Sequence, residues 1–107
     1  GRLGSLINVG GHKVDPRRVE KVIAALPGVA EVLVTAVEGR TDGSTSCCAV
    51  VASPKQAVSR KDILAQCRKN LSGYECPRQV VVVTSLPRTP RGKISADAIR
   101  VLIDQSS

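Results

Sequence analysis

The alternation of hydrophobic and polar positions near the start of the chain predicts a short hairpin followed by a helix. Residues 6–9 and 13–14 are predicted to be two short strands around the pair Gly10-Gly11, whose residues tolerate the positive φ angles of a tight turn. Asp15 is placed to cap a helix that Pro16 opens. Apolar positions then recur at i, i+3, i+4 and i+7 before a Pro-Gly pair, which predicts one buried helix face made of Val19, Val22, Ile23 and Leu26.

The middle of the chain predicts two paired strands. Residues 29–37 and 47–52 are rich in valine and small residues, which favours extended structure. The connection between them, residues 39–46, is polar and contains glycine, as expected of a loop. An antiparallel pair at the centre of a sheet follows from this order.

Two more helices and one more strand are predicted in the second half. Ser59 and Asp62 form the pattern of a capping box, residues 79–83 form a valine-rich strand, and Ser95 is placed to cap the last helix. The expected apolar positions of the two helices are Ile63, Leu64, Cys67 and Leu71, then Ile99, Leu102 and Ile103. The fold class predicted is α+β, with a small mostly antiparallel sheet, an N-terminal hairpin and about three helices packed on the sheet.

Composition narrows the class of protein. A chain of 107 residues with 42% hydrophobic and 23% charged residues is expected to fold as one domain. Tyr74 is its single aromatic residue, which disfavours nucleic-acid modules that stack bases. The formal charge of +7 suits an anionic partner, and nucleic acid, an acidic carrier protein and the phosphates of ATP or coenzyme A all qualify. The charge alone does not choose among them.

The cysteines do not predict a metal site. Cys47, Cys48, Cys67 and Cys76 include no Cys-x-x-Cys pair, and His12 is the only histidine. On a strand, the adjacent Cys47 and Cys48 point to opposite faces, which suits buried small hydrophobic residues better than a disulfide between them. Reduced thiols and a cytoplasmic location are expected. No apolar run approaches the length of a membrane-spanning helix.

Residues 86–94, with the sequence LPRTPRGKI, are the strongest candidate for chemistry. Pro87 and Pro90 each fix their own φ and bias the preceding residue toward extended geometry, and Gly92 allows close approach of a ligand to the backbone. The loop therefore presents Lys93 from a stiff base. A lysine ammonium is a compact charge suited to an anionic oxygen, although most lysines are simply solvated.

Together with the glycine-rich segment 1–20 and the segment 71–77 (LSGYECP), this loop resembles the C-terminal domain of the AMP-forming acyl-CoA synthetases. That superfamily also contains peptide-synthetase adenylation domains and luciferases. The resemblance extends from Arg2 to about Leu102 and implies that residues 1–107 form a mobile lid domain, with a hinge in residues 1–5. It also implies a large N-terminal domain that this sequence does not include, without which no activity is expected.

The resemblance implies a reaction in two halves served by rotation of this domain. A carboxylate first attacks the α-phosphate of ATP to give an acyl-adenylate, and a thiol then displaces AMP. Lys93 matches the lysine that assists the first half electrostatically. ATP and coenzyme A, or carrier-bound pantetheine, are the implied substrates, and magnesium is expected with ATP but not held by this domain.

Further site residues follow from the same resemblance. Gly10, Gly11 and His12 match the loop that lines the pantetheine tunnel in the second half, where a side chain at Gly11 would obstruct the thiol arm. Lys13 stands where many members carry an arginine near phosphates, so charge is kept and bidentate geometry is lost. Arg2 matches an arginine that contacts the nucleotide. The hinge position, usually Asp or Lys, is Gly4, which absorbs a rotation easily but removes a side-chain interaction.

Three alternatives remain open from the sequence. The domain could be the lid of a peptide-synthetase adenylation enzyme or of an acyl-carrier-protein ligase. It could be a non-catalytic basic module that docks an acidic carrier protein or nucleic acid, or a degenerate lid that only covers a neighbouring active site. The basic module explains the charge of +7 but not the loop that carries Lys93. The expected partners are therefore the N-terminal domain and coenzyme A or a carrier protein, with neither nucleic acid nor membrane.

Overall fold

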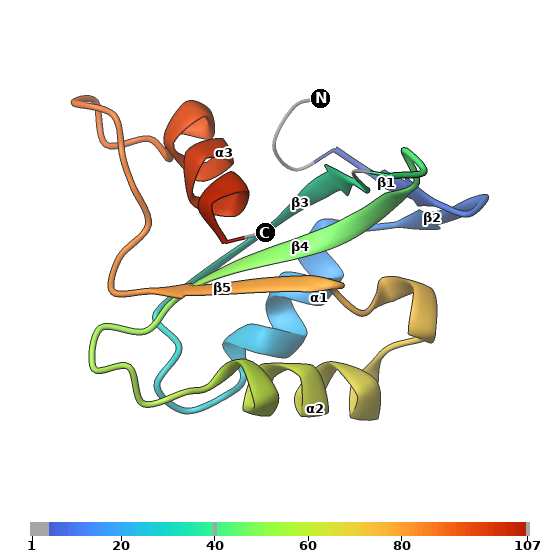
Figure 1. The fold of residues 1–107 in the computed structure, drawn as a ribbon. Helices are drawn as coiled ribbons and strands as arrows, with labels where there is room; N and C mark the ends of the chain where they lie inside the picture. Colours follow the sequence, from blue (N-terminus) through green and yellow to red (C-terminus); the bar gives the residue numbers. More distant parts are fainter. Residues whose placement is uncertain (1–4, 40, 107) are drawn as a thin grey trace.

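A three-stranded sheet separates two helical layers in the computed structural model, which describes residues 5–39 and 41–106 (Figure 1). Helices α1 and α2 cover one face of the sheet, and α3 covers the other (Figure 1). The elements are β1 (Ile7–Val9), β2 (His12–Val14), α1 (Pro16–Ala24), β3 (Glu31–Glu38), β4 (Thr45–Ala52), α2 (Arg60–Asn70), the 3-10 turn η1 (Gly73–Glu75), β5 (Gln79–Val83) and α3 (Ala96–Gln105). The predicted α+β class is confirmed, and so are the three helices among the described residues.

The sheet has the order β3-β4-β5 and a mixed direction. Strands β3 and β4 pair antiparallel from Glu31↔Ala52 to Glu38↔Thr45, while β4 and β5 pair parallel from Cys48↔Gln79 to Ala52↔Val83. A parallel neighbour requires a crossover, and α2 supplies it between β4 and β5. Antiparallel pairs still predominate once the β1-β2 hairpin is included, as the sequence predicted.

Strand β4 lies in the middle of the sheet and is buried on both faces. Its residues 47–52 are all buried, which explains the unbroken run of small and branched residues where a half-exposed strand would alternate with polar ones. Cys47 belongs to the core beneath α1 and α2, and Cys48 to the core beneath α3. The prediction that the two cysteines point to opposite faces is confirmed.

The helix starts follow the predicted caps. The Asp15 side chain accepts a hydrogen bond of 3.0 Å from the Arg17 amide, with Pro16 at the first helical position. Ser59 and Asp62 form the reciprocal capping box of α2, with bonds of 3.1 and 3.2 Å. One boundary differs, because α1 ends at Ala24, before the last apolar position of its stripe.

A buried serine joins the two turns at one end of the sheet. The Ser53 hydroxyl donates to the carbonyl of Gly28 at 2.8 Å and accepts from the amide of Ala57 at 3.2 Å. Gly28 has a φ of +90°, and a Cβ built there would come within 3.1 Å of the Ala57 Cβ. The α1-β3 and β4-α2 connections are therefore held side by side by one hydroxyl and a tight backbone contact.

Ser53→Ala is expected to lower the free energy of unfolding by about 1–3 kcal/mol, because it removes both hydrogen bonds and leaves the Ala57 amide and the Gly28 carbonyl short of a partner. Urea denaturation measures the change. Ser85→Ala, at an exposed serine, serves as control and should change stability by less than about 0.5 kcal/mol. A similar loss in both variants would contradict the role assigned to Ser53.

Burial shifts the ionisation of the cysteine thiols, all four of which are free. Desolvation raises the pKa of Cys47 and Cys67 to about 11 and that of Cys48 to about 12. The pKa of the partly buried Cys76 is also raised by burial. In the unfolded chain, by contrast, the pKa of a cysteine thiol is about 8.5.

The fold is therefore expected to lose stability as the pH rises above about 8.5 in reducing buffer. Over that range the unfolded thiols release protons while the native thiols hold theirs, so their contribution is complete below the unfolded pKa and is lost as the pH approaches the raised values. Urea midpoints between pH 7 and 10 measure this loss. Cys48→Ala should reduce the loss with pH even though it lowers stability at neutral pH, and an unchanged pH dependence would contradict the prediction.

Candidate functional site: two loops on opposite sides of the sheet

The loop that carries Lys93 is a small closed hairpin. Arg88 and Ile94 form an antiparallel bridge, and the Thr89 amide donates to the Lys93 carbonyl at 2.7 Å. The tip is a turn in which the Gly92 amide donates to the Thr89 carbonyl at 2.9 Å, with Pro90 at its second position. Gly92 has a φ of +87°, so the step before Lys93 uses a conformation that glycine adopts without strain.

The same loop is anchored at both ends in the core beneath α3. Leu86 is buried in that core, and Ile94 packs against it. The Ser95 amide closes the base of the loop with a bond of 2.9 Å to the Pro87 carbonyl. Lys93 itself is exposed, so its ammonium is free to meet a ligand that approaches from outside.

The glycine-rich loop connects β1 and β2 and is anchored in the other core. Ile7 and Val14 face each other across the hairpin and belong to the core beneath α1 and α2. Gly10 and Gly11 have φ angles of +56° and +88°, and the Asn8 side chain accepts a bond of 3.0 Å from the Gly11 amide. A Cβ at either glycine would have nothing within 4 Å, so within this domain the backbone angles, and not space, favour glycine.

His12 follows this turn and stacks on Tyr74. The two ring centroids are 4.1 Å apart and the ring planes differ by 10°. Tyr74 was not among the residues predicted for the site. Two features of the sequence could have drawn attention to Tyr74. It is the single aromatic residue, and it lies in the segment 71–77 that contributed to the family resemblance.

The turn that carries Tyr74 is itself tied to the body of the domain. Glu75 is buried, accepts from the Ser72 amide at 3.0 Å and pairs with the Arg18 guanidinium of α1 at 3.0 Å. An open cavity of about 250 Å³ lies beside it, lined by Val9, Thr45, Ser46, Gly73, Tyr74, Cys76 and Arg78. The glycine loop thus has a fixed wall and an adjacent hollow with one cationic side chain.

The remaining predicted site residues are Lys13, Arg2 and Gly4. Lys13 is exposed on β2, where it pairs in register with Asn8. Arg2 and Gly4 lie outside the described residues. The assigned roles of Lys93, Gly10, Gly11, His12 and Lys13 stay predictions.

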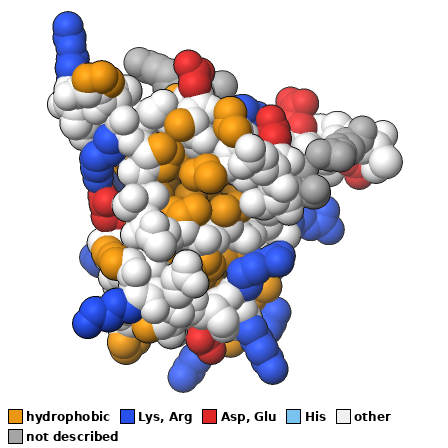
Figure 2. All heavy atoms as spheres, turned by 60° about the vertical axis from the view of Figure 1, so that its left-hand side comes forward, with side chains coloured by type: hydrophobic (Ala, Val, Ile, Leu, Met, Phe, Trp, Pro, Cys, Tyr) orange, Lys and Arg blue, Asp and Glu red, His pale blue; other side chains and the backbone are white. Residues whose placement is uncertain are grey.

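The described residues form no metal-ligand cluster, and the face seen in Figure 2 carries no basic patch. The described part of the chain contains no group of three His, Cys, Asp or Glu side chains that could hold a metal ion, and none of its helices is long and apolar enough to cross a membrane. The Lys and Arg side chains on the face seen in Figure 2 are spread around its edge and do not gather into one patch. That distribution gives a basic docking module no concentrated surface on this face.

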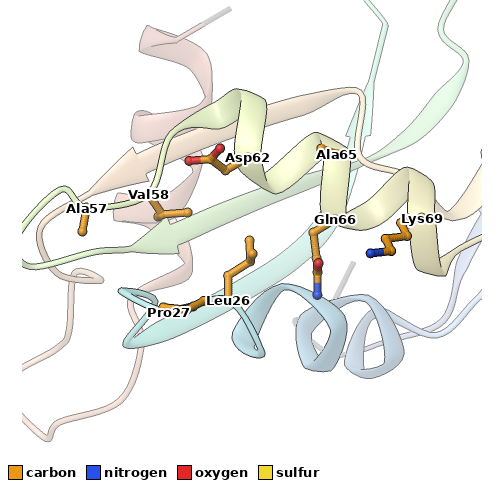
Figure 3. A pocket seen from close by; sticks show the side chains of 8 residues that line it. All are labelled: Leu26, Pro27, Ala57, Val58, Asp62, Ala65, Gln66 and Lys69. Carbon is orange, nitrogen blue, oxygen red and sulfur yellow. The ribbon is translucent and has the colours of Figure 1, made fainter.

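Another hollow lies between the end of α1 and α2 (Figure 3). Leu26 and Pro27 line one side of it, and Asp62, Gln66 and Lys69 of α2 line the other (Figure 3). Its two charged residues have opposite signs, and none of the residues predicted for the site contributes to it.

Comparison with known proteins agrees with this architecture. Residues 18–93 match the family described as the AMP-binding enzyme C-terminal domain, and the chain belongs to that family. An oxalate–CoA ligase of Arabidopsis thaliana is 36% identical over 94 residues, which make up 88% of this chain and 18% of that protein. A long-chain-fatty-acid–CoA ligase of Mycobacterium tuberculosis is 35% identical over 99 residues, 92% of this chain and 20% of that protein.

Solved structures include the same fold. The amide bond synthetase McbA of Marinactinospora thermotolerans superposes with a TM-score of 0.78 at 32% identity, over 94% of this chain and 20% of that one. The chain spans about a fifth of the length of the relatives it matches. The family expectation from the sequence is therefore confirmed.

The stack of His12 on Tyr74 is expected to stabilise the hairpin against η1. In a double-mutant cycle, His12→Ala and Tyr74→Ala should be coupled by about 0.5–1.5 kcal/mol in the free energy of unfolding. Urea denaturation of the four proteins measures the coupling. Replacing His12 by alanine together with Tyr74→Leu serves as a second cycle. Leucine keeps apolar bulk but has no ring, so a clearly smaller coupling in this cycle than in the first would show that ring stacking is not the cause.

Proposed function

We propose that this chain is the C-terminal domain of an ATP-dependent, AMP-forming acid–thiol ligase. This proposal starts from the membership of the chain in the AMP-binding enzyme C-terminal domain family. The whole enzyme would join a carboxylic acid to the thiol of coenzyme A through an acyl-adenylate. The large N-terminal domain would bind ATP and the acid, and residues 1–5 would form the hinge between the two domains.

Lys93 would act in the first half-reaction. There the carboxylate oxygen forms a bond to the α-phosphorus of ATP, and the bond to the departing pyrophosphate breaks. Two anions must be brought together for this step, so a protonated lysine on a stiff loop offsets their repulsion where charge develops. The exposed position of Lys93 at the end of a closed hairpin suits that role. Magnesium would accompany ATP in the N-terminal domain.

The loop at Gly10, Gly11 and His12 would act in the second half-reaction. The thiol sulfur bonds to the acyl carbon, its proton leaves to solvent or a base, and AMP departs with the electron pair of the broken C–O bond. A backbone turn without side chains leaves room for a narrow pantetheine arm. Arg78 lines the cavity beside this loop and Lys13 is exposed on β2, and both are candidate contacts for phosphate oxygens.

One observation carries this proposal: the two loops are anchored in different cores on opposite faces of one sheet. Leu86 and Ile94 hold the Lys93 loop in the α3 layer, whereas Ile7 and Val14 hold the glycine loop in the layer of α1 and α2. Figure 1 places them at opposite ends of the domain. A single active site in the N-terminal domain meets both loops only in turn, which is what rotation between two half-reactions requires.

The thiol acceptor is preferred over an amine because the curated relatives compared above are named CoA ligases. A second candidate is amide formation, which the likeness to an amide bond synthetase favours. Carrier-bound pantetheine is the remaining alternative for the thiol. Product analysis with coenzyme A, a phosphopantetheinylated carrier protein and a primary amine distinguishes the three acceptors.

Lys93→Ala in the full-length enzyme tests the adenylation role. The expected result is a loss of ATP–pyrophosphate exchange by about two or more orders of magnitude, because a charge donor is removed from the transition state. Thioester formation from preformed acyl-adenylate should stay within a few-fold of wild type. The two half-reactions are measured separately, by isotope exchange and by release of AMP.

Arg91→Ala provides the matched control, since it removes an exposed cation from the same turn. It should change pyrophosphate exchange by less than about threefold. Equal pyrophosphate exchange in the Lys93 variant and wild type would contradict the adenylation role of Lys93 and favour a non-catalytic lid domain. Equal loss in both half-reactions would contradict the separation of the two loops.

A further inference from the structure

The hairpin that carries Lys93 is closed by its own backbone hydrogen bonds and is also connected to the sheet by the side chain of Arg88. Its backbone hydrogen bonds, between residues 87 and 95, run within the loop. Arg88 reaches outward from it and forms an ion pair with Glu31. This ion pair joins the first arm of the hairpin to β3.

Arg88 also holds the backbone next to Lys93. Its Nη1 donates to the Gly92 carbonyl at 2.9 Å, while its Nη2 donates to the Glu31 carboxylate. One guanidinium thus bridges the peptide that precedes Lys93 and the first residue of β3. The planar fork of arginine makes two such bonds at once, which a lysine ammonium on a flexible stem does not reproduce in the same geometry.

Glu31 is a fixed point for this bridge. It is the first residue of β3 and is paired in register with Ala52 of the buried central strand. A series of contacts therefore links the sheet to the loop, from Ala52 through Glu31 and Arg88 to the Gly92 carbonyl. Without it, the hairpin would keep its internal bonds but could swing about its two ends at Leu86 and Ile94.

We propose that Arg88 and Glu31 are positioning residues that set where Lys93 stands in the adenylation half-reaction. The inference rests on the proposed function and goes beyond it by assigning two residues that do not touch the substrate. Catalysis by a charge donor depends steeply on its placement, and an error of about 1 Å can cost about a hundredfold in rate. A bridge to the rigid sheet limits such an error.

The pair is suited to orientation and contributes little to folding. The Arg88 and Glu31 side chains are 41% and 42% exposed, and ion pairs at such exposed sites contribute little to stability. Its removal should therefore leave the domain folded. The consequence is expected in the order of the loop and in the rate of adenylation.

The test uses Arg88→Ala and Glu31→Ala in the full-length enzyme, with Arg91→Ala as the control in the same turn. Both variants should lower kcat for ATP–pyrophosphate exchange by about 10- to 100-fold with KM for ATP and acid within about twofold. Thioester formation from preformed acyl-adenylate should be unchanged. Arg88→Lys should fall between Arg88→Ala and wild type, because the charge remains but the double bridge does not.

A second readout follows the loop directly. Hydrogen–deuterium exchange of the peptide that contains residues 88–94 should be faster in Arg88→Ala and in Glu31→Ala than in wild type or Arg91→Ala. In the double variant, the loss of kcat should not exceed that of Arg88→Ala alone, because both residues act through one bridge.

The outcomes separate this inference from the function it rests on. If Lys93→Ala abolishes exchange while Glu31→Ala matches wild type, the positioning role is wrong and the adenylation role stands. A loss confined to the Arg88 variants would mean that Arg88 meets the substrate itself. If Lys93→Ala leaves exchange unchanged, the proposed function fails and the positioning role fails with it.

Discussion

The rest of the structure depends on the burial of β4 on both faces. Its residues 47–52 are all buried, and each alternate side chain enters a different core. A strand covered on both sides requires helices above and below it, so α1 and α2 must pack on one face and α3 on the other. Ser53, which follows this strand directly, holds the adjoining turns together with one buried hydroxyl.

This layered arrangement places the glycine loop and the Lys93 loop on opposite sides of the sheet. Each motif loop begins and ends at residues buried in one core, so the central sheet keeps the loops apart: Leu86 and Ile94 lie on the side of α3, and Ile7 and Val14 lie on the other. Both loops use positive φ angles at glycine, at Gly92 and at Gly10-Gly11, and both are closed by internal hydrogen bonds. A rigid body with two stiff loops is suited to alternate contacts with one larger partner domain.

Local patterns predicted most of the secondary structure because the governing interactions are local. The Asp15 and Ser59 caps, the Gly10-Gly11 turn and the spacing of apolar positions in α1 act within a few residues of one another. The short turn η1 was missed, since a single 3-10 turn leaves no periodic signal. The site was predicted less completely. Lys93 and the glycines stood out in the sequence, whereas Tyr74 did not suggest a contact with His12, 62 residues away along the chain.

The sequence by itself determined the main helices and strands, the opposite faces taken by Cys47 and Cys48, and the family that its three motif segments indicate, because each is encoded in short local runs of residues. Tertiary structure alone decided which distant residues meet. The parallel pairing of β5 with β4, the stack of His12 on Tyr74 and the bridge from Glu31 through Arg88 to Gly92 join segments separated by whole elements. Such contacts depend on how the layers pack, and packing is a property of the whole core that no local pattern encodes.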